Sequence, residues 1–110
     1  MKDIILALEK YRIDLPELIM QIKKDLILAG IDTDILQSVQ NEKELVYRFF
    51  QLIEELLIHS PNSFQNLLYR IDLDEKKLDS LNSEHIQWEL TVLILQRELQ
   101  KVYFRKKFSQ

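Results

Sequence analysis

The C-terminal end of the chain combines cationic and aromatic side chains at helical spacing. Arg97, Lys101 and Arg105 follow one another at intervals of four residues, and Phe104 and Phe108 repeat that interval. Residues four apart lie on the same side of an α-helix. The segment therefore predicts a helical face that carries positive charge and rings together. Such a face can bind a partner protein, or it can pair with phosphates and stack on the bases of single-stranded nucleic acid.

We take Arg97, Lys101, Phe104, Arg105 and Phe108 as the candidate partner-binding residues. The function that we expect is a non-catalytic protein-interaction or regulatory module, whose partner is another protein or a second copy of the chain. Nucleic-acid binding through the same helix end is the alternative. A purely structural role also stays open, because bases near a helix C-terminus offset the partial negative charge of its free carbonyls.

Metal chemistry would depend on the two histidines. His85 and Glu89 are one helical turn apart, Glu84 is adjacent, and Glu55 and His59 repeat that spacing. Helical di-iron proteins use Glu-x-x-His pairs, and the chain contains none. We expect no metal and no cofactor, and we treat these side chains as surface residues at helix ends. A metal-dependent helical enzyme that uses His85, Glu84 and Glu89 is the second alternative.

Other catalytic groups are scarce. The chain has no cysteine and one glycine, so it offers neither a thiolate nor a glycine-rich phosphate loop. Its serines fall at predicted helix caps and ends, where hydrogen bonds to the backbone explain them. We therefore expect a protein that is not an enzyme. The lack of cysteine also agrees with a cytoplasmic location.

The charge distribution is uneven. The net charge is −3, yet residues 97–110 carry five bases and one acid, a net charge of +4 that leaves −7 for the rest. A basic end on an acidic body can orient a partner or the chain itself. The longest apolar runs are too short to span a bilayer, and the first residues make a poor signal peptide.

The elements that must position these side chains are helices. A length of 110 residues fits one domain, residues 1–110, and one glycine with two prolines leaves little material for sheets or long loops. We predict an all-α fold, a compact bundle of four main helices with two or three short ones. The predicted helices cover about 2–12, 15–29, 42–59, 61–71 and 83–108, with a short one around Ile35, Leu36 and Val39.

Several helix ends have recognisable signals. Gly30 is placed to end a helix in the left-handed conformation, and Ser60 followed by Pro61 is typical of a new start. Three pairs have capping-box spacing, in which the first side chain bonds the backbone of the third residue after it. These pairs are Asp14 with Glu17, Asn41 with Glu44, and Asp72 with Glu75.

The pentapeptide Tyr-Arg-Ile-Asp-Leu occurs twice, at 11–15 and at 69–73. The rest of the chain does not repeat at that offset, so we interpret the two copies as local joints and not as a duplication. In this interpretation Tyr and Ile close one helix on the core, and Asp caps the next.

The last helix is predicted to be the centre of the bundle. It can run unbroken from a cap at Asn82 or Ser83 to about Phe108, with apolar stripes on two sides of its first half. A helix that is apolar on two sides is surrounded by others. We therefore expect its beginning to be wrapped by neighbours and its basic, aromatic end to be partly uncovered.

Two segments carry a family resemblance, 67–73 (Leu-Leu-Tyr-Arg-Ile-Asp-Leu) and 93–102 (Leu-Ile-Leu-Gln-Arg-Glu-Leu-Gln-Lys-Val). They resemble small all-helical proteins of Bacteroidetes-type bacteria, a group without an assigned activity. The resemblance implies a bacterial cytosolic protein, and it assigns a role to no residue.

Overall fold

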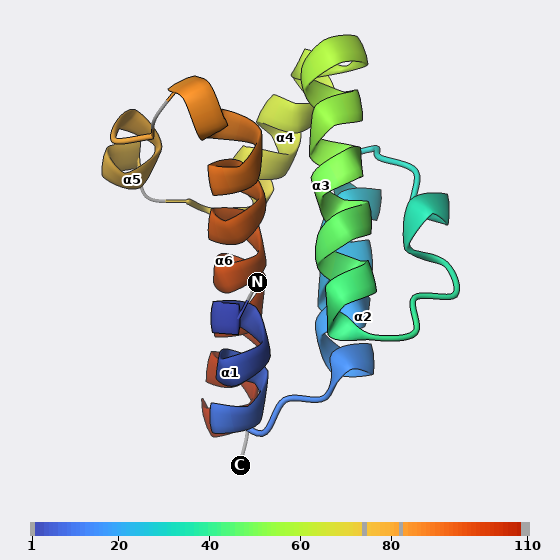
Figure 1. Cartoon of the computed structure of the whole chain (residues 1–110), viewed down its shortest axis with the longest axis vertical. Coiled ribbons are helices and arrows are strands. Elements are labelled where there is room, and N and C mark those ends of the chain that lie inside the picture. The colour runs from blue at the N-terminus through green and yellow to red at the C-terminus, as the bar shows by residue number, and fades with distance from the viewer. Residues whose placement is uncertain (1, 74, 82, 109–110) are drawn as a thin grey trace.

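The chain folds into helices joined by short loops in the computed structural model, which describes residues 2–73, 75–81 and 83–108 (Figure 1). No strand occurs within these residues, so the predicted all-α class is confirmed. The α-helices are α1 (Lys2–Lys10), α2 (Leu15–Leu28), α3 (Glu42–His59), α4 (Pro61–Ile71), α5 (Glu75–Asp79) and α6 (Ile86–Phe108). Two short 3₁₀ helices are η1 (Asp34–Leu36) and η2 (Ser83–His85).

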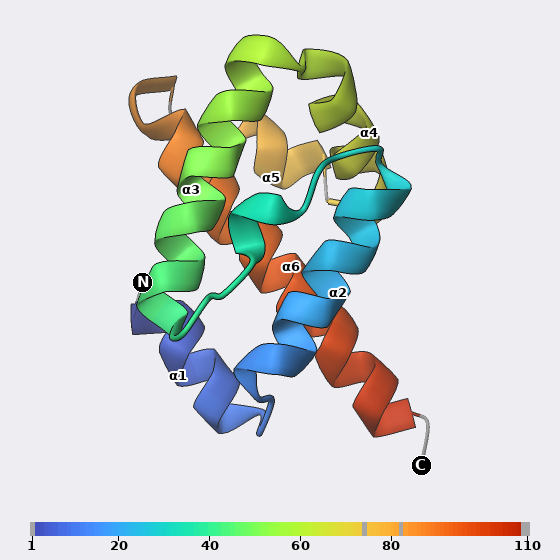
Figure 2. The same cartoon turned by 90° about the vertical axis from the view of Figure 1, so that its right-hand side faces the viewer.

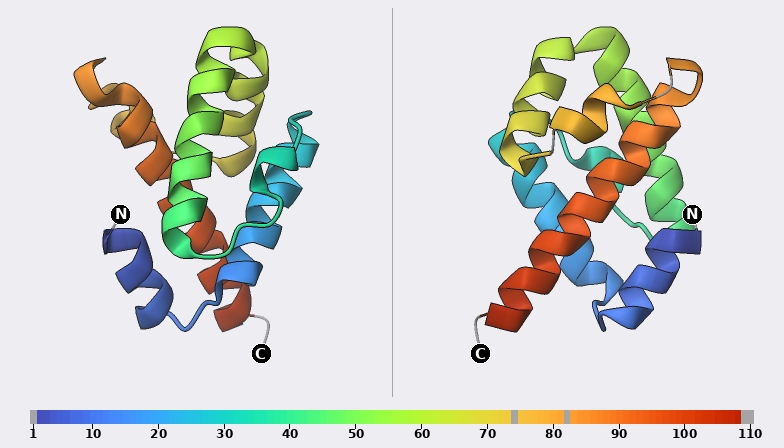
Figure 3. Two further views of the ribbon diagram at one scale, coloured as in Figure 1. Left: turned by 45° about the vertical axis from the view of Figure 1, so that its right-hand side comes forward. Right: turned by 90° about the vertical axis from the view of Figure 1, so that its left-hand side faces the viewer.

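Helix α6 is the central element, as predicted. It contacts α1, α2, α3 and α4, and it crosses the molecule diagonally so that its last turns project past α2 (Figure 2). The opposite view shows α6 in front, with α1 beside its second half and α5 beside its first (Figure 3, right). Because α6 contacts four other helices, it sets the positions of the elements around it.

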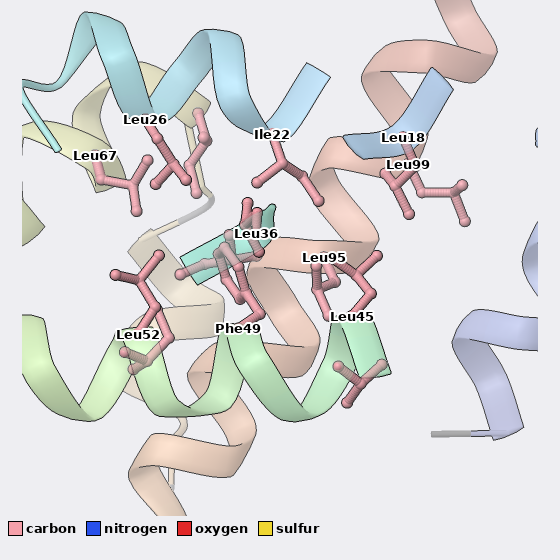
Figure 4. Close-up of a cluster of buried hydrophobic side chains, with 14 of the residues drawn as sticks. Leu18, Ile22, Leu26, Leu36, Leu45, Phe49, Leu52, Leu67, Leu95 and Leu99 are labelled. Carbon is pink, nitrogen blue, oxygen red and sulfur yellow. The ribbon is translucent and has the colours of Figure 1, made fainter. Parts of the chain in front are cut away.

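The core lies where α2, η1, α3 and α6 meet. Figure 4 shows Ile22 of α2, Leu36 of η1, Phe49 of α3 and Leu95 of α6 converging on one another, and each is at most 1% exposed. The chain between α2 and α3 thus contributes to the core, because η1 buries Leu36 there. Burying side chains of this size stabilises the fold by about 1.5–3 kcal/mol each.

Helices α1 and α2 end in the same way. Gly30 has a φ of +77°, and the N–H of Ile31 donates to the carbonyl of Leu26 at 2.9 Å. At the end of α1, Arg12 has a φ of +55°, and the N–H of Ile13 donates to the carbonyl of Leu8 at 3.0 Å. Both are Schellman endings. The role of Gly30 is confirmed, whereas the same role for Arg12 had no sequence signal, because glycine normally fills that position.

The predicted capping box of Asn41 with Glu44 forms. Its Oδ1 accepts the N–H of Glu44 at 2.9 Å, while Oε2 of Glu44 accepts the N–H of Gln40 at 3.2 Å. Asp14 occupies the N-cap position of α2, but its side chain makes no capping hydrogen bond, so that prediction is wrong. Ser60 precedes α4 without a side-chain cap.

The two copies of the pentapeptide adopt different backbones. The left-handed residue is Arg12 in the first copy and Asp72, with a φ of +58°, in the second. Asp72 is therefore the C-cap residue of α4, a role that we had not predicted. The side chain of Glu75, with which we had predicted a capping box, lies outside the described part of the chain. Tyr69 is 89% exposed, so the prediction that both tyrosines close on the core is wrong as well. The shared feature is the buried isoleucine, Ile13 and Ile71. Tertiary packing anchors that side chain, and the polar residues around it adapt.

Helix α6 is unbroken from Ile86 to Phe108, but its most buried part is its middle. Ile86 and Trp88 in its first turn are 37% and 38% exposed, so the predicted wrapping of the first half fails at the first turn, although it holds from Leu90 onward. The diagonal crossing explains this, because the neighbours cover α6 only where they cross it. The 3₁₀ helix η2 begins at Ser83, and the cap predicted at Asn82 lies outside the described residues.

We predict that Asn41→Ala lowers the free energy of unfolding by about 1 kcal/mol, because it removes the one side-chain cap bond seen at α3. Asp14→Ala is the matched control, since Asp14 holds the same position without that bond. Urea unfolding followed by circular dichroism measures both variants. Equal losses in the two variants would contradict the assignment.

Candidate functional site on the last helix

The structure places all five predicted partner-binding residues on the second half of α6, but its contacts separate the cations from the rings. Arg97 lies against the end of α4: its Nε donates to the carbonyl of Ile71 at 3.0 Å, and its Nη1 donates to Oε1 of Gln100 at 3.4 Å. The guanidinium therefore satisfies a terminal carbonyl of α4. This contact is a structural use of the charge.

Lys101 and Arg105 turn toward α2. The Nζ of Lys101 donates to Oδ2 of Asp25 at 2.8 Å, and Nη1 of Arg105 donates to Oε1 of Gln21 at 2.6 Å. Gln21 in turn donates from Nε2 to Oδ2 of Asp25 at 3.0 Å. Both cations thus belong to one hydrogen-bond network that joins α2 to α6.

A buried carboxyl pair lies at the centre of this network. Asp25 of α2 and Glu98 of α6 are 2% and 1% exposed, and Lys101 reaches both, with Nζ 3.7 Å from Oε1 of Glu98. Arg70 of α4 approaches from the other side, with Nε 3.9 Å from Oδ1 of Asp25. Oε1 of Glu98 has no hydrogen-bond partner within the described residues. Two carboxylates cannot both remain charged at such a place without a large desolvation penalty.

Glu98 avoids this penalty by keeping its proton. Burial raises the pKa of Glu98 to about 9, and the hydrogen bond and negative charge of Asp25 add to that rise, while Lys101 opposes it. Burial also acts to raise the pKa of Asp25, but hydrogen bonds from Glu98, Lys101 and Gln21 outweigh it, and the pKa is lowered. At neutral pH Glu98 is therefore a neutral donor, Asp25 is charged, and Lys101 balances Asp25.

The rings form a separate, exposed row along α6. Tyr103 contacts Phe104 with ring centroids 5.5 Å apart, and Phe104 stacks on Phe108 at 6.1 Å. Tyr11, at the end of α1, packs on Tyr103 at 4.5 Å and continues the row onto the neighbouring helix. Phe104 is 47% exposed and Phe108 is 74% exposed. These rings contact one another, yet they leave apolar surface exposed to water at the end of α6.

A groove of about 390 Å³ runs beside this row, between α1 and α6. Apolar and aromatic side chains make up most of its lining, and two amides complete it. We call this surface the aromatic groove; its lining is Ala7, Tyr11, Gln96, Leu99, Gln100, Tyr103 and Phe104. Figure 3 (right) looks onto the side of the molecule on which these two helices lie.

Two lysines sit over the rings beside the groove. The Nζ of Lys10 is 5.4 Å from the ring centroid of Tyr11, and that of Lys107 is 5.7 Å from Tyr103 and 5.8 Å from Phe108. Cation–π contacts at exposed sites are worth only about 0.5–1 kcal/mol. The two ammonium groups therefore remain available to a charged partner, and no acidic side chain is among those that line the groove.

The remaining sequence candidates do not assemble into a site. Within the described residues, no three His, Cys, Asp or Glu side chains come close enough together to hold a metal ion. Glu84 and His85 are exposed and lie in η2, just before α6. None of the helices described is long and apolar enough to cross a membrane.

Sequence reasoning missed the carboxyl pair and the ring of Tyr11. The signal for the pair was present, because Asp25 lies three residues after Ile22 and Glu98 lies three residues after Leu95, each on a buried apolar stripe. An acid at that position requires a neutralising partner.

Comparison of the chain with models of protein families, with curated proteins and with solved structures finds no match.

The titration of Glu98 predicts that stability falls as the pH rises. The folded chain keeps a proton on Glu98 up to a pKa of about 9, whereas the unfolded chain releases it near 4.5. Between these values the free energy of unfolding should fall by about 1.4 kcal/mol per pH unit from this group. Glu98→Gln, whose amide stays neutral and can still donate to Asp25, should remove this fall and stabilise the protein at pH 8.

Urea unfolding between pH 5 and pH 9, at about one-unit steps, measures that dependence. Glu9→Gln, on the exposed surface of α1, is the matched control and should retain the wild-type slope. A wild-type stability that does not change across this range would show that Glu98 is not held neutral by the fold.

We also predict that Lys101→Met is strongly destabilising, by about 3 kcal/mol, because it leaves the charge of Asp25 buried without its nearest cation. Lys107→Met is the matched control on the same helix. Lys107 is exposed, and its substitution should change stability by no more than about 0.5 kcal/mol. Thermal unfolding of the two variants distinguishes a structural cation from a surface one.

Proposed function

We propose that the protein is a non-catalytic protein-interaction module whose binding surface is the aromatic groove. The observation that carries this proposal is a continuous row of four rings that contact one another: Tyr11, Tyr103, Phe104 and Phe108. The last two are 47% and 74% exposed. Clustered exposed aromatic surface is typical of binding sites, and Tyr and Phe are frequent anchors in interfaces.

The contacts that the basic side chains make within the chain support a protein partner over nucleic acid. Arg97, Lys101 and Arg105 donate hydrogen bonds to the chain itself. Lys106 pairs with Glu17 at 3.2 Å. Few cations then remain for phosphates, on which nucleic-acid affinity depends. The surface that is left is mainly apolar and suits burial against another protein.

The state of the buried acids supports a role without catalysis. Among the described residues, Asp25 and Glu98 are the groups with perturbed pKa values, and perturbed groups are the usual catalytic candidates. Both are at most 2% exposed, so a substrate does not reach them. Their network joins α2 to α6 instead.

The lack of cysteine supports a cytoplasmic location as part of this proposal.

A photo-crosslinking amino acid at position 104 tests the proposal. In cells, a benzophenone side chain in place of Phe104 should form protein adducts, because it lies in the groove. The same side chain in place of Tyr69, the most exposed ring at 89%, should form few, since Tyr69 lies outside the groove. Equal adduct yields at the two positions would contradict the groove as the binding surface, and adducts to nucleic acid would favour the alternative.

A further inference from the structure

A second surface, on the other side of the molecule, has the opposite charge. Between η1 and α3 lies a groove of about 430 Å³ whose lining contains four acids and no base: Asp32, Asp34, Ile35, Gln51, Leu52, Glu54 and Glu55. The nearest base in the adjoining groove is Arg48, which is held by Glu44 at 2.6 Å and donates to two backbone carbonyls. The acids therefore determine the charge of this surface.

Exposed apolar side chains accompany these acids along α3. Tyr47 is 60% exposed and Ile58 is 65% exposed, and with Gln51 and Glu54 they follow a spacing of four, three and four residues. Residues at this spacing share one side of a helix. The outward side of α3 is therefore both apolar and acidic. We call it, together with the η1–α3 groove, the acidic face.

The acidic face and the aromatic groove are complementary in charge and in apolar content. The aromatic groove carries Lys10 and Lys107 and is lined by no acid, whereas the acidic face carries four acids around Tyr47 and Ile58. We propose that the aromatic groove binds the acidic face of a second copy of this chain, so that copies associate head to tail. This inference rests on the proposed function and names the occupant of that site.

The positions of the two surfaces determine the kind of assembly. Figure 2 looks onto η1 and α3, and the right panel of Figure 3 looks from the opposite side onto α6 and α1. Pairing two aromatic grooves would bring Lys10 and Lys107 of each copy together, which like-charge repulsion disfavours. Contact between unlike surfaces leaves one groove and one acidic face open on each pair, so further copies can add.

The secondary structure of the occupant suits this contact. A helix such as α3 satisfies its own backbone hydrogen bonds and presents only side chains. The aromatic groove is formed by α1, the turn that follows it and α6, which offer no strand edge to an extended peptide. From Gln96 to Phe108 the ridge of α6 is about 18 Å long at 1.5 Å per residue, which matches three turns of a partner helix.

Sedimentation equilibrium of the full chain, from about 1 μM to about 1 mM, tests the inference with two blocking variants. Phe104→Glu blocks the groove, and the double variant Glu54→Lys with Ile58→Lys blocks the acidic face. The wild type should exceed twice the mass of one chain as its concentration rises, and each variant alone should keep the mass of one chain. An equal mixture of the two variants should reach twice that mass and stop there, because it offers one matched contact.

Circular dichroism confirms that the variants remain folded, and Tyr69→Lys, which changes a ring outside both surfaces, should associate as the wild type does. A wild type that keeps the mass of one chain throughout would overturn the inference. So would association that survives either block, or a mixture that stays at the mass of one chain. If position 104 crosslinks to other proteins while the chain stays monomeric, this inference fails and the proposed function stands.

Discussion

The contact between Lys101 and Asp25 is the constraint on which the arrangement of α2 and α6 depends. Its length of 2.8 Å and the burial of Asp25 make it a charge-assisted bond in a poorly hydrated place, where a shift of one helix along the other would leave Asp25 unpaired. It also orients the surface of α6. Phe104 is three residues beyond Lys101, about 300° further around the helix, so it lies about 60° to one side of Lys101. Fixing Lys101 against α2 therefore turns Phe104 away from α2 and toward the side on which α1 lies.

Most of the fold could be predicted from the sequence, because its signals are local. The apolar spacing located the helices, Gly30 ended α2, and Asn41 with Glu44 began α3, each through contacts within a few residues. The failures occur where a local signal competes with packing. Asp14 and Asp72 have the same four sequence neighbours, yet Asp14 is extended before α2 and Asp72 is left-handed after α4. Ile13 and Ile71 are both buried, at 4% and 0% exposed, so the joints differ in the helices that they connect and not in the burial of this side chain.

The sequence predicted which residues the candidate site contains, but not which contacts they make. The spacing of bases and rings placed both on one end of α6, and the structure describes them there. The sequence could not predict that the bases bond to the chain itself while the rings stay exposed. The bases bond to Asp25, Gln21 and Ile71, which lie at least 26 residues away from them. Tyr11 joined the rings for the same reason: α1 packs beside α6, and no local pattern predicts that packing. The signal that we overlooked in the sequence was an acid on each of two buried apolar stripes. A buried acid requires a partner that neutralises it.

The protonation of Glu98 links the interior of the protein to the charge on its surface. If both carboxyl groups were ionised, the crossing of α2 and α6 would carry an excess negative charge, and more of the basic end would have to turn inward to neutralise it. With Glu98 neutral, the ammonium group of Lys101 balances the charge of Asp25. Lys107 then stays outside, over the rings of Tyr103 and Phe108. The aromatic groove can therefore be positive in a protein that is acidic as a whole, because one buried proton replaces a second cation.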